Sequence, residues 1–152
     1  MLAIRPATVP DHEAVVELLV AQLREHAIDT PRAALGRAVD GLLRNPDRGR
    51  LLVATVDGAA IGVAALSFVH TLEHADRSAW LEELYVAPAH RGRGIGTALL
   101  EAACDVAAAA GAVAVDLEVD ATHERAAHLY ARSDFRPLPR ARWVRRLTPA
   151  SG

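Results

Sequence analysis

The sequence predicts a mixed α/β fold, in which a central and mostly antiparallel sheet of about six or seven strands is flanked by about four helices. Three observations point to it. The chain has 152 residues, 51% of them hydrophobic, which is enough to bury the core of a single domain over residues 1–152. Strand-like segments follow one another before residue 86, and two of them are joined by the hairpin dipeptide Asp57-Gly58. Beyond residue 94, helix and strand alternate as in a βαβ unit.

The first third of the chain predicts one strand and two helices. Leu2–Arg5 is a short strand. Asp11 opens an amphipathic helix, because apolar side chains then recur every three or four residues as far as Leu23. A second helix covers about Pro31–Leu43, where proline suits the first turn, and Asn45-Pro46-Asp47 ends it.

The middle of the chain predicts three consecutive strands. Leu51–Val56 and Ala60–Val69 flank the hairpin dipeptide, and Ala79–Val86 follows as the third strand. Such a series forms an antiparallel meander, and the helices before and after it are expected to cover both faces of the sheet.

The last third predicts an alternation of helices and strands. Ile95–Ala110 is an alanine-rich helix, and Gly111 after it is suited to a helix C-terminus. A strand at Val113–Val119, a helix at Thr122–Arg132 and a final strand at Trp143–Leu147 follow. The expected order of elements is therefore β-α-α-β-β-β-α-β-α-β.

Composition excludes several classes of function. All 17 basic residues are arginine, so a lysine Schiff base and a Walker-type phosphate lysine are both impossible in this chain. The formal charge of −2 does not favour nucleic acid as a partner. Cys104, the single cysteine, forms neither an internal disulfide nor a zinc framework, and we expect no metal. The longest apolar run, Val106–Val115, is too short to span a membrane, and Met1–Pro10 lacks the pattern of a secretory signal, so we expect a cytoplasmic protein without a membrane partner.

The most informative segment is the glycine-rich turn between Val86 and Thr97. Glycines there let a ligand approach the backbone, and the free N–H groups at a helix start favour an anion such as pyrophosphate. A dinucleotide fingerprint would need a third glycine where Thr97 stands. The pattern that remains is Arg-x-x-Gly-x-Gly, formed by Arg91, Gly94 and Gly96. The alternative is a plain strand-to-helix turn that is rich in glycine.

These motifs resemble the acetyl-CoA-binding motif of the GNAT N-acetyltransferases. The resemblance rests on Leu84-Tyr85-Val86, Pro88, Arg91–Gly96 and Leu99-Leu100, and the strand before the glycines is most similar to diamine-type enzymes. Further matches lie on both sides of this segment, at Ile4-Arg5-Pro6-Ala7, Asp11, Leu117-Glu118-Val119, Ala126, Leu129-Tyr130 and Phe135. Two positions depart from the family pattern: His123 replaces an asparagine, and Asp134 replaces the glycine before the phenylalanine.

The resemblance implies that acetyl-CoA is the co-substrate. It places the pantetheine arm along the strand that ends at Val86, where a backbone N–H would stabilise the oxyanion, and the pyrophosphate on the N–H groups of the glycine turn. The residues that it assigns to cofactor binding are Leu84, Tyr85, Val86, Arg91, Gly92, Arg93, Gly94, Ile95, Gly96, Thr97, His123 and Ala126.

The same resemblance assigns the catalytic groups. Tyr130 matches the tyrosine that protonates the CoA sulfur, and a phenol is a neutral donor at pH 7. Two carboxylates compete for the role of base: Glu82 resembles the amine-binding glutamate of diamine enzymes, and Glu118 resembles the proton acceptor of protein N-terminal acetyltransferases. Because side chains alternate along a strand, Glu82 and Glu83 are expected on opposite faces. A bound water that relays the proton is the third alternative.

The leading prediction is an acetyl-CoA-dependent N-acetyltransferase in which an amine attacks the thioester directly in a ternary complex. An acidic lining suggests a small-molecule acceptor, an amine or polyamine-like compound, and it is offered by Glu73, Asp76, Glu82 and Glu83. The alternatives are a protein N-terminal or lysine acetyltransferase, for which Glu118 is the motive, and a CoA-binding regulatory module without turnover. A homodimer is kept as a possible assembly.

Overall fold

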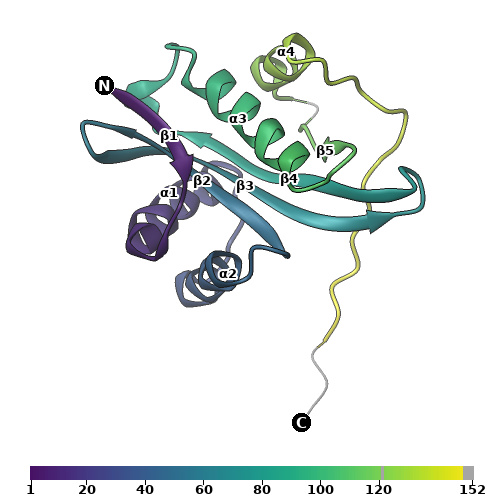
Figure 1. The fold of residues 1–152 in the computed structure, drawn as a ribbon, viewed down its shortest axis with the longest axis horizontal. Coiled ribbons are helices and arrows are strands. Elements are labelled where there is room, and N and C mark those ends of the chain that lie inside the picture. The colour runs from purple at the N-terminus through teal and green to yellow at the C-terminus, as the bar shows by residue number, and fades with distance from the viewer. Residues whose placement is uncertain (121, 149–152) are drawn as a thin grey trace.

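The computed structural model describes residues 1–120 and 122–148, which form a five-stranded sheet with helices on both faces (Figure 1). Helices α1 and α2 cover one face, and α3 and α4 lie over the other. The helices and strands are β1 (Leu2–Pro6), α1 (His12–Glu25), α2 (Arg32–Arg44), β2 (Gly49–Val56), β3 (Ala59–Thr71), β4 (Asp76–Val86), α3 (Ile95–Ala109), β5 (Val115–Leu117) and α4 (Glu124–Arg132). The predicted α/β class, the four helices and their order are confirmed, whereas the described sheet has five strands rather than six or seven.

The sheet has the order β1-β2-β3-β4-β5, so neighbours in the chain are neighbours in space. The first four strands are antiparallel, and only β5 runs parallel to its neighbour β4. Asp57 and Gly58 turn the β2–β3 hairpin with φ angles of 50° and 83°, the two positive values that a type I′ turn requires. The hairpin predicted from this dipeptide is therefore confirmed.

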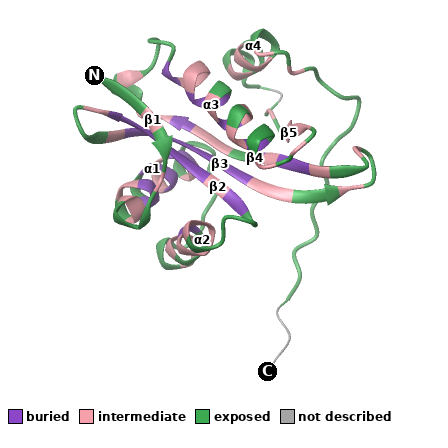
Figure 2. Cartoon of the chain, in the orientation of Figure 1, coloured by how far each residue is buried: buried purple, intermediate pink, exposed green. Residues whose placement is uncertain are grey.

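Two apolar cores lie on the two faces of the sheet (Figure 2). Side chains of β2 contribute to both cores, because they alternate between the two faces. Leu52 packs on the face covered by α3, and Leu51 packs on the opposite face, while Val53 is also buried. Small residues let α3 lie close to the sheet, and Ala103 and Ala107 are almost completely buried. The alanine-rich helix is thus a packing element, and it holds the glycine turn at its own N-terminus against the sheet.

Local sequence explains where α1 begins and where α3 ends. Asp11 accepts two hydrogen bonds from the Arg5 guanidinium, at 2.7 and 2.9 Å, and one from the Thr8 backbone N–H at 2.7 Å, which ties the end of β1 to the start of α1. Gly111 follows α3 with φ 89°, and the N–H of Ala112 reaches the carbonyl of Ala107 at 3.0 Å, as in a Schellman motif.

The predicted final strand at Trp143–Leu147 is wrong. The segment has no strand pairing, and Trp143, Val144 and Leu147 are 91%, 80% and 81% exposed. Pro137 and Pro139 precede it, and proline cannot donate to a strand ladder. Arg140 and Arg142, just before this segment, form ion pairs with Glu73 and Glu118, and the apolar residues after them are left exposed.

Candidate active site

A β-bulge in β4 determines which carboxylate faces the interior. The register pairs Leu66 with Leu81 and Ala65 with Glu83, so Glu82 is the extra residue without a partner on β3. The bulge shifts the alternation by one position. Leu81 and Leu84, three residues apart, both pack into the core on the α3 face. Glu83 consequently shares the α1 face with Tyr85, which is buried in the opposite core.

Strands β4 and β5 separate immediately beyond this bulge. The two strands pair only over Ala79–Leu81 and Val115–Leu117. The N–H of Ala87 donates to Ile61 on β3, so the backbone groups of Leu84 and Val86 face the other way, toward the gap. Their N–H groups have no strand partner among the described residues. Three residues of this strand were predicted to bind pantetheine. The backbone groups of Leu84 and Val86 face the gap and form its free edge, whereas those of Tyr85 face β3.

The carbonyl groups on this free edge are satisfied by side chains. Arg91 Nε donates to the carbonyl of Val86 at 2.8 Å, and Gln22 Nε2 of α1 reaches the carbonyl of Leu84 at 3.5 Å. These contacts leave the N–H groups as the free polar atoms of the edge. A site that offers donors and withholds acceptors suits a carbonyl oxygen that gains negative charge.

The glycine turn leads from β4 into α3. Gly92 and Gly94 both have φ 78°, a conformation that side chains other than glycine rarely adopt, and Gly94 is the N-cap of α3. No side chain caps this helix start, and its first internal bond is donated by Ala98 to Gly94 at 3.0 Å. The earlier N–H groups, at Ile95, Gly96 and Thr97, point beyond the helix end. A Cβ at Gly96 would meet only the Val86 side chain, at 3.9 Å, so open space surrounds the turn. These residues fit a diphosphate.

Arg91 is turned from the glycines toward α1. Its Nη2 donates to both carboxylate oxygens of Glu25, at 2.9 and 3.1 Å, and its guanidinium lies 5.3 Å from the centre of the Tyr85 ring. The contact of Arg91 with pyrophosphate stays a prediction, as does that of Arg93. In this structure Arg91 connects α1, the end of β4 and the glycine turn.

The sequence indicated Glu83 only as part of an acidic lining and not as a base. Burial raises the pKa of its carboxyl to about 7; the neighbouring charge of Glu82 acts in the same direction, and a hydrogen bond from the Gln22 amide acts against it. A carboxyl that titrates near neutral pH is suited to accept and release a proton. The sequence did contain a sign that Glu83 is buried. Tyr85, an aromatic residue, lies two positions further along the strand and therefore on the same face.

Tyr130 comes from α4, on the opposite side of the sheet from α1. Burial raises the pKa of its phenol, and the negative charge of Glu83 raises it further. The phenol is therefore a neutral proton donor near pH 7. Asp134 turns the chain after α4 with φ 65° and so directs Phe135 back onto the Tyr130 ring, at 5.8 Å between ring centres. Aspartate at the family's glycine position thus preserves the turn.

The two carboxylates favoured by the sequence are engaged by other side chains. Glu82 is exposed and accepts a hydrogen bond from the Ser67 hydroxyl of β3. Glu118 follows β5, is half-exposed and accepts a hydrogen bond at 2.8 Å from Arg142, whose guanidinium also lies over the Trp80 ring. Their catalytic roles stay predictions.

The other predicted cofactor residues lie at the start of α4. His123 is the N-cap of this helix, and its ring lies 5.5 Å from that of His26 at the end of α1. Ala126 is half-buried one turn further along. The end of α1 and the start of α4 therefore lie close together.

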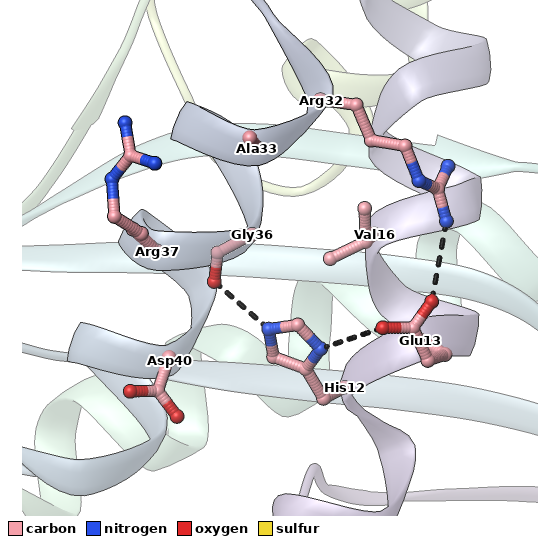
Figure 3. Close-up of a pocket in the computed structure, with 8 residues that line it drawn as sticks. All are labelled: His12, Glu13, Val16, Arg32, Ala33, Gly36, Arg37 and Asp40. Carbon is pink, nitrogen blue, oxygen red and sulfur yellow. Dashed lines mark hydrogen bonds and ion pairs between the residues drawn. The ribbon is translucent and has the colours of Figure 1, made fainter.

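A separate groove with a volume of about 900 Å³ lies between α1 and α2 (Figure 3). His12 bonds the Gly36 carbonyl at 2.8 Å through Nε2, and this contact, followed by the nearby Glu13, raises the pKa of the imidazole. The groove lies at the beginning of α1, whereas Gln22 and Glu25 stand near its end. It is lined by His12, Glu13, Val16, Arg32, Ala33, Gly36, Arg37 and Asp40.

The described residues contain neither a metal-binding cluster nor a membrane-spanning helix. Over residues 1–120 and 122–148, no three His, Cys, Asp or Glu side chains gather closely enough to hold a metal ion. No helix in these same ranges has the length and apolar character to cross a bilayer.

Comparisons with known proteins point to one family. The model of the Acetyltransferase (GNAT) family matches residues 13–135. The chain is 37% identical over 102 residues to streptothricin acetyltransferase of Streptomyces lavendulae, covering 63% of this chain and 49% of that protein. It is 30% identical over 138 residues to an uncharacterized N-acetyltransferase of Mycobacterium tuberculosis, covering 89% and 74%. A solved aminoglycoside N-acetyltransferase in complex with CoA matches with a TM-score of 0.84 and 21% identity, covering 96% of this chain and 95% of that chain.

These matches differ in what they support. The chain spans about half the length of the streptothricin enzyme. The structural match, at 21% identity, is evidence for the fold alone. The family model and the mycobacterial relative cover most of the chain, and together they support the family that the motifs resemble.

Proposed function

Because the chain belongs to the GNAT acetyltransferase family, we propose that it transfers an acetyl group from acetyl-CoA to a primary amine of a small molecule, by direct attack of the amine in a ternary complex. The observation that carries the proposal is the pair formed by Glu83 and Tyr130. Beside the free edge of β4, the negative charge of Glu83, whose own pKa is raised to about 7, raises the pKa of the Tyr130 phenol. The glycine turn begins a few residues further along the chain.

Glu83 is proposed as the base. An amine with a pKa near 10 arrives as an ammonium ion, which has no lone pair for attack. The Glu83 carboxylate takes a proton from it and passes that proton to solvent. Its raised pKa makes it a stronger base than an ordinary carboxylate, and it is still half ionised near pH 7.

The free edge of β4 and Tyr130 are proposed to serve the acyl group. Acetyl-CoA supplies the thioester, whose acetyl group goes to the amine while the CoA sulfur leaves. The N–H of Leu84 or Val86 donates to the thioester oxygen as it becomes negative. Tyr130 donates its proton to the leaving sulfur and recovers one from the nitrogen as the amide forms. In total the ammonium and thioester yield an amide, a thiol and one proton.

The acceptor is proposed to be a small amine or polyamine-like compound. Glu82 and Glu83 place two carboxylates at the bulge of β4, which favours a cation. The relative named streptothricin acetyltransferase and the matched aminoglycoside enzyme suggest two further small molecules to test. The competing protein N-terminal function has less support, because its proposed base, Glu118, is engaged by Arg142.

Thiol release from acetyl-CoA across a panel of acceptors tests the proposal. The panel holds butylamine, phenethylamine, putrescine, spermidine, streptothricin, an aminoglycoside and a peptide with a free N-terminal alanine. We expect thiol release with small amines, and mass spectrometry of the product must show one added acetyl group. Release with the peptide alone would favour the N-terminal function. Binding of CoA without release for any acceptor would favour the regulatory module.

A further inference from the structure

The amide of Gln22 is the buried polar group that the proposed chemistry has not yet used. Gln22 lies on α1 and is only 6% exposed. Its Nε2 donates toward the Leu84 carbonyl at 3.5 Å, and the amide lies close enough to the Glu83 carboxyl to act against the rise of its pKa. These two acceptors fix the orientation of the amide, since the reverse orientation would turn an oxygen toward both of them.

This orientation leaves the other end of the amide without a partner. Gln22 Oε1 and His90 Nδ1 are the buried side-chain polar atoms that lack a hydrogen bond within residues 1–120 and 122–148. Burial of an amide oxygen without a donor is unfavourable. A ligand that brings an N–H group to this position would remove that cost. Because the same amide contacts Glu83, the missing donor lies beside the proposed base.

We propose that Gln22 is a positioning residue whose Oε1 accepts a hydrogen bond from the attacking amino group and thereby restricts the acceptor to primary amines. The inference rests on the proposed function, because it concerns the amine that Glu83 deprotonates. After one proton has gone to Glu83, a primary amine keeps two N–H groups and its lone pair. One N–H pairs with Glu83 and the other with Gln22, while the lone pair is directed at the thioester carbon.

A secondary amine cannot make both contacts at the moment of attack. As an ammonium ion it has two N–H groups, enough for Glu83 and Gln22, so its binding is nearly unimpaired. After deprotonation the secondary amine has one N–H group, which pairs with Glu83. Gln22 Oε1 is then left without a hydrogen-bond donor. The discrimination between primary and N-methylated amines is therefore expected in kcat rather than in KM.

Gln22→Met tests this assignment, because methionine keeps the length of the side chain and removes both polar ends. The assay compares the best primary monoamine of the panel with its N-methyl derivative, for example butylamine and N-methylbutylamine. We expect kcat for the primary amine to fall roughly 10-fold and kcat for the N-methyl amine to change less than about 2-fold. Leu23→Met, at the next position of α1, is the matched control and should preserve the ratio of the two rates.

The outcomes separate this inference from the proposed function. Equal losses for both amines, or an unchanged ratio in Gln22→Met, would overturn the role of Gln22 while acetyl transfer stands. No thiol release by the wild-type protein with any amine would overturn the proposed function and, with it, this inference. If Gln22→Met does not fold, Gln22→Glu keeps the shape and an acceptor oxygen, and its protonated form can still donate to Glu83. That variant should keep the preference for primary amines, and its loss would contradict the inference.

Discussion

Arg91 in the glycine turn is held by Glu25 at the end of α1. The guanidinium donates to both carboxylate oxygens, at 2.9 and 3.1 Å, and also bonds the last carbonyl of β4. Arg91 thus connects helix α1 to the glycine turn that is proposed to bind the cofactor.

Glu25→Gln should weaken CoA binding slightly by releasing Arg91. The pair is more than 40% exposed on both sides, and such pairs contribute about 1 kcal/mol at most, so the affinity should fall no more than about 5-fold. Calorimetric titration with CoA measures it, with Glu13→Gln at the other end of α1 as the control. A loss of 100-fold would mean that Glu25 itself contacts the ligand.

Gly96→Val should weaken CoA binding sharply without unfolding the protein. A Cβ at this position contacts nothing nearer than 3.9 Å, so the side chain intrudes only where a ligand would meet the backbone. We expect the CoA affinity to fall at least roughly 10-fold, or about 1.4 kcal/mol, with little change in Tm. Unchanged affinity in a folded variant would contradict the assignment of the turn. Gly94→Val is a poorer test, because φ 78° would strain the fold as well.

Tyr130→Phe should separate binding from chemistry. The ring and its edge contact with Phe135 remain, so Tm and CoA affinity should be close to those of the wild type. Loss of the hydroxyl should lower kcat by roughly 10²-fold, the contribution of one general acid. Measurement at saturating acceptor gives the answer, and an unaffected kcat would assign protonation of the sulfur to water.

Glu83 should also make the stability of the protein depend on pH. Its pKa is raised from 4.5 to about 7 on folding, so between these values the folded state binds more proton than the unfolded state. The stability that this proton provides is complete below pH 4.5 and is lost as the pH rises through 7. The Tm of Glu83→Gln minus that of the wild type should therefore increase across this range, whereas Glu118→Gln should show no such increase.

The glycine turn could be predicted from the sequence, whereas the bulge in β4 could not. The turn is encoded locally, because Gly92, Gly94 and the helix start after them occupy consecutive positions, and it was predicted at the correct residues. The bulge at Glu82 arises from the register of two strands, which no pattern within β4 alone records. The resemblance to diamine enzymes drew attention to Glu82, whereas the bulge leaves Glu82 exposed and turns Glu83 toward α1.

The tail shows a second limit of the sequence. Apolar and basic residues are mixed in Trp143–Leu147, but a strand also needs a neighbour with a free edge and a face to bury. The described tail instead follows ion pairs, from Arg140 to Glu73 at 2.8 Å and from Arg142 to Glu118 at 2.8 Å. Partners this far apart in the sequence cannot be identified from composition or spacing.

The dependence of kcat/KM on pH in Glu83→Gln, measured with the best small amine of the panel, tests the central claim most directly. The wild-type rate should rise with pH and level off above about 7, as Glu83 ionises. Glu83→Gln should lose roughly 10²- to 10⁴-fold in rate and the rise near pH 7, while Glu82→Gln and Glu118→Gln keep it. A wild-type profile in Glu83→Gln, with the rise lost in Glu82→Gln or Glu118→Gln, would contradict the account and move the base to that residue.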